Sequence, residues 1–175
     1  MLVLLTALSL ASATVSQAPQ RARPDFFPIS VWYSGGKARA PMLSELTPSS
    51  RAEWRRDLQQ IKELGFNTVR TWVEWAHAEP GRGEYRLDNL RLLLELAQES
   101  GLRVMVQMYV DAAPDWVGRA YPQARFVAQN GVAIPSQVAP GFCTDNAEIR
   151  DLVDKLYAAV ARVASRYPSF YGWDL

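Results

Sequence analysis

Aromatic and charged side chains gather in and directly behind two apolar stretches of the sequence, residues 67–73 and 102–109. The first group is Arg70, Trp72, Glu74, Trp75, His77 and Glu79, and the second group is Tyr109, Asp111, Asp115 and Trp116. Indole and phenol rings offer flat apolar faces to the C–H faces of sugars, while guanidinium and carboxylate groups hydrogen-bond to hydroxyl groups. The combination therefore predicts a carbohydrate ligand.

The candidate substrate-binding residues are Arg70, Trp75, Tyr109, Asp111 and Trp116. Arg70 is the strongest of them, because a guanidinium at a buried strand end needs either a carboxylate partner or a substrate. The three aromatic residues have a second interpretation, which is ordinary packing of the loops. Asp111 hydrogen-bonds either the backbone or a sugar.

Two further carboxylates have structural interpretations. Glu79 precedes Pro80 in a turn, and we expect its carboxylate to anchor the loop that follows rather than to react. Asp174, in the last strand of the sequence, is interpreted as an ionic partner or part of a frayed end. Two of the four carboxylates Glu74, Glu79, Asp111 and Asp115 could form a catalytic pair, but this hypothesis is weaker than a structural or binding role for them.

Several chemistries lack the residues that they need. The chain has one histidine, His77, and one cysteine, Cys143. One imidazole can form neither a histidine-based metal cluster nor a Ser-His-Asp triad, and one thiol allows no intramolecular disulfide and no multi-thiolate zinc site. We therefore expect no metal and no cofactor.

The charge balance and the composition limit the partners. With 19 basic and 18 acidic residues the net charge is +1, which gives no electrostatic reason to expect nucleic acid or an anionic membrane. Apolar residues make up 49% of the chain and aromatic residues 11%, enough for one globular core.

Apolar strands alternate with amphipathic helices from residue 25 onward, the pattern of a parallel sheet covered by helices. The predicted strands are 26–33, 67–73, 102–109 and a start at 170–175, and the predicted helices cover 50–64, 88–100 and 149–164. Ser50 and Glu53 have capping-box spacing, Asp88 is placed to cap the second helix, and Gly65 and Gly101 are placed to end the first two. Residues 110–145 form a long connection whose aromatic residues favour an ordered loop.

A (β/α)8 barrel fits this order better than a doubly wound sheet, because Gly35 and Gly36 lead into a loop rather than directly into a helix. A complete barrel takes eight strands and about 250 residues. Residues 25–175 are therefore predicted to form one α/β unit, the N-terminal half of a TIM barrel with strands one to four and three helices. Its open sheet edges favour self-association.

Residues 1–18 resemble a secretory signal peptide. A short apolar run, Leu2 to Ala13, is followed by small and polar residues. The run is well short of the roughly 20 residues that span a bilayer. We expect a secreted or periplasmic protein with no membrane anchor.

Residues 51–175 resemble glycoside hydrolase family 42, the β-galactosidase-type barrels. The likeness rests on Gly65-Phe66-Asn67-Thr68-Val69-Arg70, Trp75-Ala76, Glu79-Pro80, Gly83, Tyr85, Leu87-Asp88, Ala112-Ala113-Pro114-Asp115-Trp116-Val117, Tyr121-Pro122, Arg166-Tyr167-Pro168 and Gly172-Trp173. The resemblance implies a retaining glycosidase that acts on β-galactosides or similar saccharide fragments without a cofactor.

The resemblance also implies where the catalytic carboxylates lie. The acid would be a glutamate directly after strand four and the nucleophile a glutamate after strand seven, so neither would be among these 175 residues. The sequence then predicts the N-terminal part of a secreted glycosidase, inactive alone. The alternatives are a non-catalytic, carbohydrate-binding or self-assembling half-barrel and, less favoured because of the single histidine, a metal-dependent isomerase or aldolase barrel.

Overall fold

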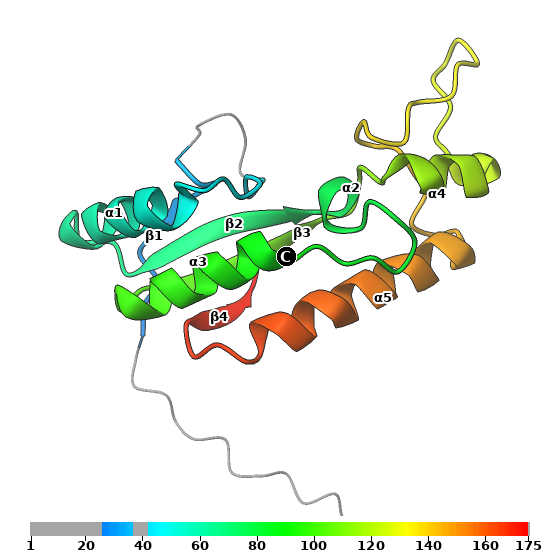
Figure 1. Ribbon diagram of the computed structural model, residues 1–175. Helices are drawn as coiled ribbons and strands as arrows, with labels where there is room; N and C mark the ends of the chain where they lie inside the picture. Colours follow the sequence, from blue (N-terminus) through cyan, green and yellow to red (C-terminus); the bar gives the residue numbers. More distant parts are fainter. Residues whose placement is uncertain (1–25, 37–41, 175) are drawn as a thin grey trace, which may run out of the picture.

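A computed structural model describes residues 26–36 and 42–174, so the predicted signal segment lies outside the described residues. Four parallel strands form one sheet in the order β1-β2-β3-β4 (Figure 1). The strands are β1 (Ser30–Trp32), β2 (Thr68–Glu74), β3 (Arg103–Tyr109) and β4 (Phe170–Trp173). Neighbours in sequence are neighbours in the sheet, as the first half of a barrel requires.

Three long helices connect the strands: α1 (Ser50–Glu63), α3 (Asp88–Glu99) and α5 (Ala147–Ala164). Figure 1 shows them along one side of the sheet, and contacts join α1 to α3 and α3 to α5. The predicted fold class is confirmed, with every predicted strand and long helix present. No helix in the described part of the chain combines the length and the apolar character needed to cross a membrane.

Alternation along the strands separates two faces of the sheet. On β2, Val69, Thr71 and Val73 are buried under the helices, whereas Arg70, Trp72 and Glu74 are partly exposed on the opposite face. The same alternation buries Val104, Val106 and Met108 on β3. Because successive side chains point to opposite faces, one face of the sheet forms the core and the other carries the polar and aromatic candidates.

The helix ends correct part of the capping prediction. Ser49, not Ser50, precedes α1 and makes no side-chain cap, while the Ser50 hydroxyl accepts a hydrogen bond from the Thr47 N–H. Leu87 precedes α3, and Asp88 inside the helix pairs with Arg91 instead of capping. The spacing alone does not say which of two adjacent residues takes the non-helical conformation that a cap needs.

The predicted glycine terminators are confirmed. Gly65 follows α1 and Gly101 follows α3, with φ angles of +92° and +66°. Side chains rarely adopt these left-handed values, and glycine has no Cβ to oppose them.

Short helices occupy the loops that follow β2 and β3. One turn, α2 (Trp75–Ala78), directly follows β2 where only loop was predicted. The long connection contains α4 (Asp115–Ala120) and a 3-10 turn, Pro122–Ala124, and residues 125–142 then form an excursion closed by antiparallel bridges (Figure 1). The expected ordered loop is therefore present, and Trp116 and Tyr121 pack against the core.

Candidate functional site

A row of aromatic rings crosses the partly exposed face of the sheet. Trp32 on β1 meets Trp72 on β2 edge to face, with ring centroids 5.6 Å apart. Trp72 in turn stacks on Tyr109 at the end of β3, with centroids 5.0 Å apart and an interplanar angle of 11°. We call these three side chains the aromatic row. It offers continuous apolar ring surface at the carboxyl ends of the strands.

Arg70 lies beside the aromatic row and has a carboxylate partner. Its Nε donates to Asp174 Oδ2 at 2.9 Å, its Nη2 donates to the same oxygen, and its guanidinium carbon lies 4.1 Å from the centre of the Trp32 ring. The sequence predicted either a carboxylate or a substrate for Arg70, and Asp174 supplies the carboxylate. The two side chains retain 31% and 17% exposure, so both still face solvent.

Tyr109 remains protonated at neutral pH. Burial raises the pKa of its phenol, and the nearby charges of Asp111 and Glu74 raise that pKa further. The hydroxyl is therefore available as a hydrogen-bond donor as well as an acceptor. Asp111 is exposed, and its carbonyl accepts a hydrogen bond of 2.7 Å from the Gly141 N–H, which holds the excursion near the sheet.

Trp75 lies in the core rather than on the substrate-facing side. Its side chain has no exposed area, and its Nε1 donates to Glu79 Oε2 at 2.8 Å. Position 75 continues the alternation that buries Val69, Thr71 and Val73, so Trp75 falls on the core face of the sheet. In this structure its indole is available for loop packing and not for contact with a sugar.

Glu79 anchors its loop, as the sequence predicted. Its side chain is 2% exposed, and its second oxygen accepts a hydrogen bond of 2.8 Å from the Gly83 N–H. The Glu79 carbonyl also accepts from Trp116 Nε1 at 2.9 Å, which ties α4 to the same loop. Trp116, a predicted sugar contact, is thus half-buried with its polar atom engaged.

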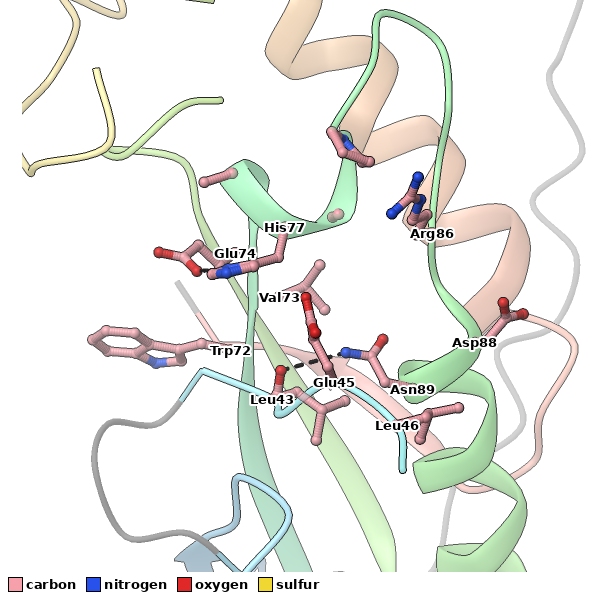
Figure 2. A pocket seen from close by; sticks show the side chains of 13 residues that line it. Leu43, Glu45, Leu46, Trp72, Val73, Glu74, His77, Arg86, Asp88 and Asn89 are labelled. Carbon is pink, nitrogen blue, oxygen red and sulfur yellow. Dashed lines mark hydrogen bonds and ion pairs between the residues drawn. The ribbon is translucent and has the colours of Figure 1, made fainter. Parts of the chain in front are cut away.

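A pocket of about 300 Å³ lies between the end of β2 and the start of α3 (Figure 2). Three segments line it: residues 43–46, residues 72–80 and residues 86–89. Trp72 and Glu74 contribute to the pocket from the sheet, and the Glu74 carboxylate forms an ion pair with His77 on α2. No sequence pattern predicts this pocket, because residues 43–46 have no periodicity and form a wall only when they fold against β2 and α3.

Among residues 26–36 and 42–174, no three histidine, cysteine or acidic side chains gather in a way that could hold a metal ion. In the same part of the chain, the indole N–H of Trp72 is buried without a hydrogen-bond partner. The polar chemistry at this face therefore comes from Arg70, Asp174, Tyr109, Glu74 and His77.

Comparison with known proteins agrees with this arrangement. Residues 47–175 match the profile of glycoside hydrolase family 42, described as beta-galactosidase. The chain belongs to glycoside hydrolase family 42. The matched segment runs from the loop before α1 through β4, so it contains Trp72 and Tyr109 of the aromatic row and the Arg70–Asp174 pair, whereas Trp32 on β1 precedes it.

Several curated and solved β-galactosidases are similar to this chain. The chain is 25% identical over 127 residues to the beta-galactosidase LacZ of Heyndrickxia coagulans, which covers 70% of this chain and 18% of that protein. The solved β-galactosidases of Rahnella sp. R3 and Halorubrum lacusprofundi match with TM-scores of 0.61 and 0.59 at 25% and 26% identity. They cover 69% and 74% of this chain and 18% and 19% of theirs. This family 42 chain thus spans about a fifth of the length of these relatives.

Proposed function

We propose that this family 42 chain supplies the sugar-contacting part of a β-galactosidase-type retaining glycosidase. The observation that carries the proposal is the aromatic row next to the Arg70–Asp174 pair, at the carboxyl ends of parallel strands. In a β/α barrel these strand ends and their loops carry the reacting and binding groups.

Each group on this face has a role suited to a neutral sugar. Because Trp72 and Tyr109 stack on each other, the outer face of the Tyr109 ring takes the C–H face of a pyranose, and the Tyr109 hydroxyl donates to or accepts from a ring hydroxyl. Arg70 has five N–H donors, of which Asp174 engages two. We propose that the remaining donors bind a sugar hydroxyl and the nucleophile carboxylate.

We further propose that the acid and the nucleophile are not among the carboxylates described at this face. Asp174 pairs with Arg70, Glu74 pairs with His77, and Glu79 is buried with both oxygens accepting hydrogen bonds. A retaining glycosidase needs two carboxyl groups about 5 to 5.5 Å apart and facing the scissile bond. The family resemblance assigns them to glutamates after strands four and seven of the barrel.

The proposed location of the protein is secreted or periplasmic, based on the signal-like pattern of residues 1–18. Expression of the native reading frame in a bacterial host tests this proposal. Mature protein that begins near residue 18 in the periplasm or medium would support export, and full-length protein in the cytoplasm would count against it.

The binding experiment records ¹H–¹⁵N spectra of the chain during titration with β-1,4-galactobiose. We expect the side-chain N–H signals of Trp72 and Arg70 to shift, and a Tyr109→Ala variant to bind about 5- to 10-fold more weakly, because a stacked ring contributes about 1 kcal/mol or more. Phe126→Ala, which removes an exposed ring on the excursion, is the matched control. No shift of either reporter at saturating sugar would refute binding at this face.

A separate experiment tests the proposal that the catalytic acid and nucleophile are not among the described carboxylates. The 175-residue chain is expected to leave aryl β-galactosides intact, and the reading frame past codon 175 is expected to encode a glutamate within a few residues and four further strand-helix units. Hydrolysis by the purified chain, or a frame without that glutamate, would overturn this part. A chain that binds sugar without such a continuation would instead be a non-catalytic carbohydrate-binding half-barrel.

A further inference from the structure

The pocket between the end of β2 and the start of α3 has an apolar floor on the helix side of the sheet. Leu43, Val73 and Ala78 are buried and form this floor, and Val73 is one of the β2 side chains that face the core. The aromatic row lies on the opposite face of the sheet. The volume of about 300 Å³ is at the lower end of small-molecule sites, which hold about 300 to 1,000 Å³, so a ligand of this pocket is small.

Hydrogen bonds fix the walls of this pocket. Asn89 Nδ2 donates to the carbonyls of Leu43 and Ser44, which holds residues 43–46 against the start of α3. The Leu43 N–H donates to the Trp72 carbonyl at 2.9 Å, and the Arg86 N–H donates to the Ala78 carbonyl at 2.8 Å. The pocket is therefore preorganised, and a ligand does not have to order these loops.

Two opposite charges on the rim are free to bind a ligand. Within the described residues, neither the Glu45 carboxylate nor the Arg86 guanidinium has a hydrogen bond or an ion pair, and the two do not pair with each other. The other charged groups of the lining are engaged, because Glu74 pairs with His77 and Asp88 pairs with Arg91. Figure 2 shows Glu45 extending from residues 43–46 into the open space that Arg86 borders from the other side.

These two charges select the charge of the ligand. An anion would be attracted by Arg86 and repelled by Glu45, and a cation would be attracted by Glu45 and repelled by Arg86. A zwitterion presents an ammonium group to the carboxylate and a carboxylate to the guanidinium, so it gains from both. The floor between the two charges adds an apolar surface to this requirement.

We propose that this pocket binds a free α-amino acid with a branched apolar side chain, of about the size of leucine. The ammonium group donates to the Glu45 carboxylate, and the Arg86 guanidinium donates to the carboxylate of the ligand. The side chain leaves the α-carbon between these two groups and packs on Leu43 and Val73, where it is removed from water. This inference goes beyond the proposed sugar-binding function and does not rest on it, because it uses no residue of the aromatic row.

The test titrates the 175-residue chain with L-leucine and records ¹H–¹⁵N spectra. The backbone amides of Glu45 and Arg86 and the side-chain amide of Asn89 report on the pocket. Three analogues each lack one feature of leucine: isocaproate has no ammonium group, leucinamide has no carboxylate, and glycine has no side chain. We expect leucine to shift all three reporters and each analogue to bind at least about 5-fold more weakly.

Two variants assign the charges of the ligand to their partners. Glu45→Gln and Arg86→Gln are each expected to weaken leucine binding about 5- to 10-fold, between the effect of an exposed ion pair and that of a hydrogen bond to a charged group. Isocaproate should bind Glu45→Gln no more weakly than wild type, and leucinamide should bind Arg86→Gln no more weakly than wild type. Both positions are exposed, so the variants should fold.

Glu63→Gln and Arg56→Gln are the matched controls, because they make the same changes on the exposed side of α1. They should leave leucine binding unchanged. Pocket signals that stay fixed up to the solubility limit of leucine would overturn the proposal. It would also be wrong if isocaproate or leucinamide bound as tightly as leucine, or if both pocket variants kept the wild-type affinity, because the pocket would then not recognise a zwitterion.

Discussion

At the scale of single residues, Glu79 should be the most sensitive position of the loop after β2. Its carboxylate is buried and accepts from Trp75 Nε1 and from the Gly83 N–H. Glu79→Ala leaves the buried Trp75 Nε1 without an acceptor, whereas the N–H of the exposed Gly83 can turn to water, so we expect a loss of about 1 to 3 kcal/mol in the free energy of unfolding. Urea denaturation followed by circular dichroism measures it.

Two substitutions control that prediction. Glu79→Gln keeps one carbonyl oxygen as an acceptor and should retain part of the stability. Glu84→Ala removes an exposed carboxylate from the same loop and should change stability by no more than about 0.5 kcal/mol. Equal stability of Glu79→Ala and wild type would show that the loop does not depend on this anchor.

The Arg70–Asp174 pair is expected to couple the middle of the sheet to its last strand. The pair is partly buried and joins β2 to the residue after β4 through two donors on one oxygen. A double-mutant cycle with Arg70→Gln and Asp174→Asn should give a coupling of about 1 to 2 kcal/mol. A coupling near zero would mean that solvent screens the pair as it screens an exposed one.

Tyr33 should make the fold sensitive to alkaline pH. Its phenol is buried and donates to Asp57 at 2.9 Å, and burial, followed by that bond and the charges of Asp57 and Glu53, raises its pKa above 10.0. The contribution of the Tyr33 phenol to the free energy of unfolding is fully present below its pKa in the unfolded state. It is lost as the pH rises from that value toward the pKa in the folded state. Stability measured from about pH 8 to 11 should therefore fall at the upper end, and fall less in Tyr33→Phe. Parallel curves for the two proteins would contradict this assignment.

Residue types predicted some roles at this scale and not others. The Glu79 anchor was predictable because a Glu-Pro turn places a carboxylate over the amides that follow. The position of Trp75 was predictable too, because residue 75 continues the alternation of Val69, Thr71 and Val73 on the core face, but its residue type was taken instead as a sign of sugar contact. For Arg70 the sequence predicted either a carboxylate or a substrate, since a half-buried guanidinium needs one of the two, and the structure shows the carboxylate of Asp174.

At the scale of elements, α5 should depend on its cap in a way that α1 does not. Asn146 Oδ1 accepts from the N–H groups of Glu148 and Ile149, whereas Ser49 before α1 makes no side-chain cap. Asn146→Ala should cost about 1 kcal/mol and Asn146→Asp much less, because aspartate also accepts from free N–H groups at a helix start. Ser49→Ala is the matched control, and an equal loss at both positions by thermal denaturation would contradict the assigned caps.

The order of the elements was predictable, and their ends and loops were only partly so. The alternation of a strand and the 3.6-residue period of a helix are each recognised from many side chains, so one atypical residue does not change the predicted element. A helix cap depends on the backbone conformation of one residue, which the spacing of Ser50 and Glu53 does not record. The predicted cap at Ser50 was wrong for this reason. The pocket depends on residues 43–46 meeting α3 through Asn89, a contact between distant segments that no local pattern records.

At the scale of the whole molecule, the exposed sheet face and edges should drive self-association. Neither β1 nor β4 pairs on its outer side with another strand of the described chain. Trp32 on β1 is 42% exposed, and Ile29 and Phe27 before it are 51% and 80% exposed. Unpaired strand edges next to apolar surface template pairing with a second chain. The chain without residues 1–18 should elute as an oligomer and bind a hydrophobic dye.

The substitution that tests this association places a charge on the edge strand. Trp32→Lys should shift the chain toward monomer and reduce dye binding, because a lysine on an edge opposes strand pairing and removes the largest exposed ring of β1. Leu64→Lys replaces a side chain that is 70% exposed at the end of α1, outside the strands, and should leave the oligomer unchanged. Sedimentation velocity separates the two cases. If wild-type protein sediments as a monomer and unfolds in one sharp transition, the open face is stable in water and another explanation is needed for its exposed aromatic residues.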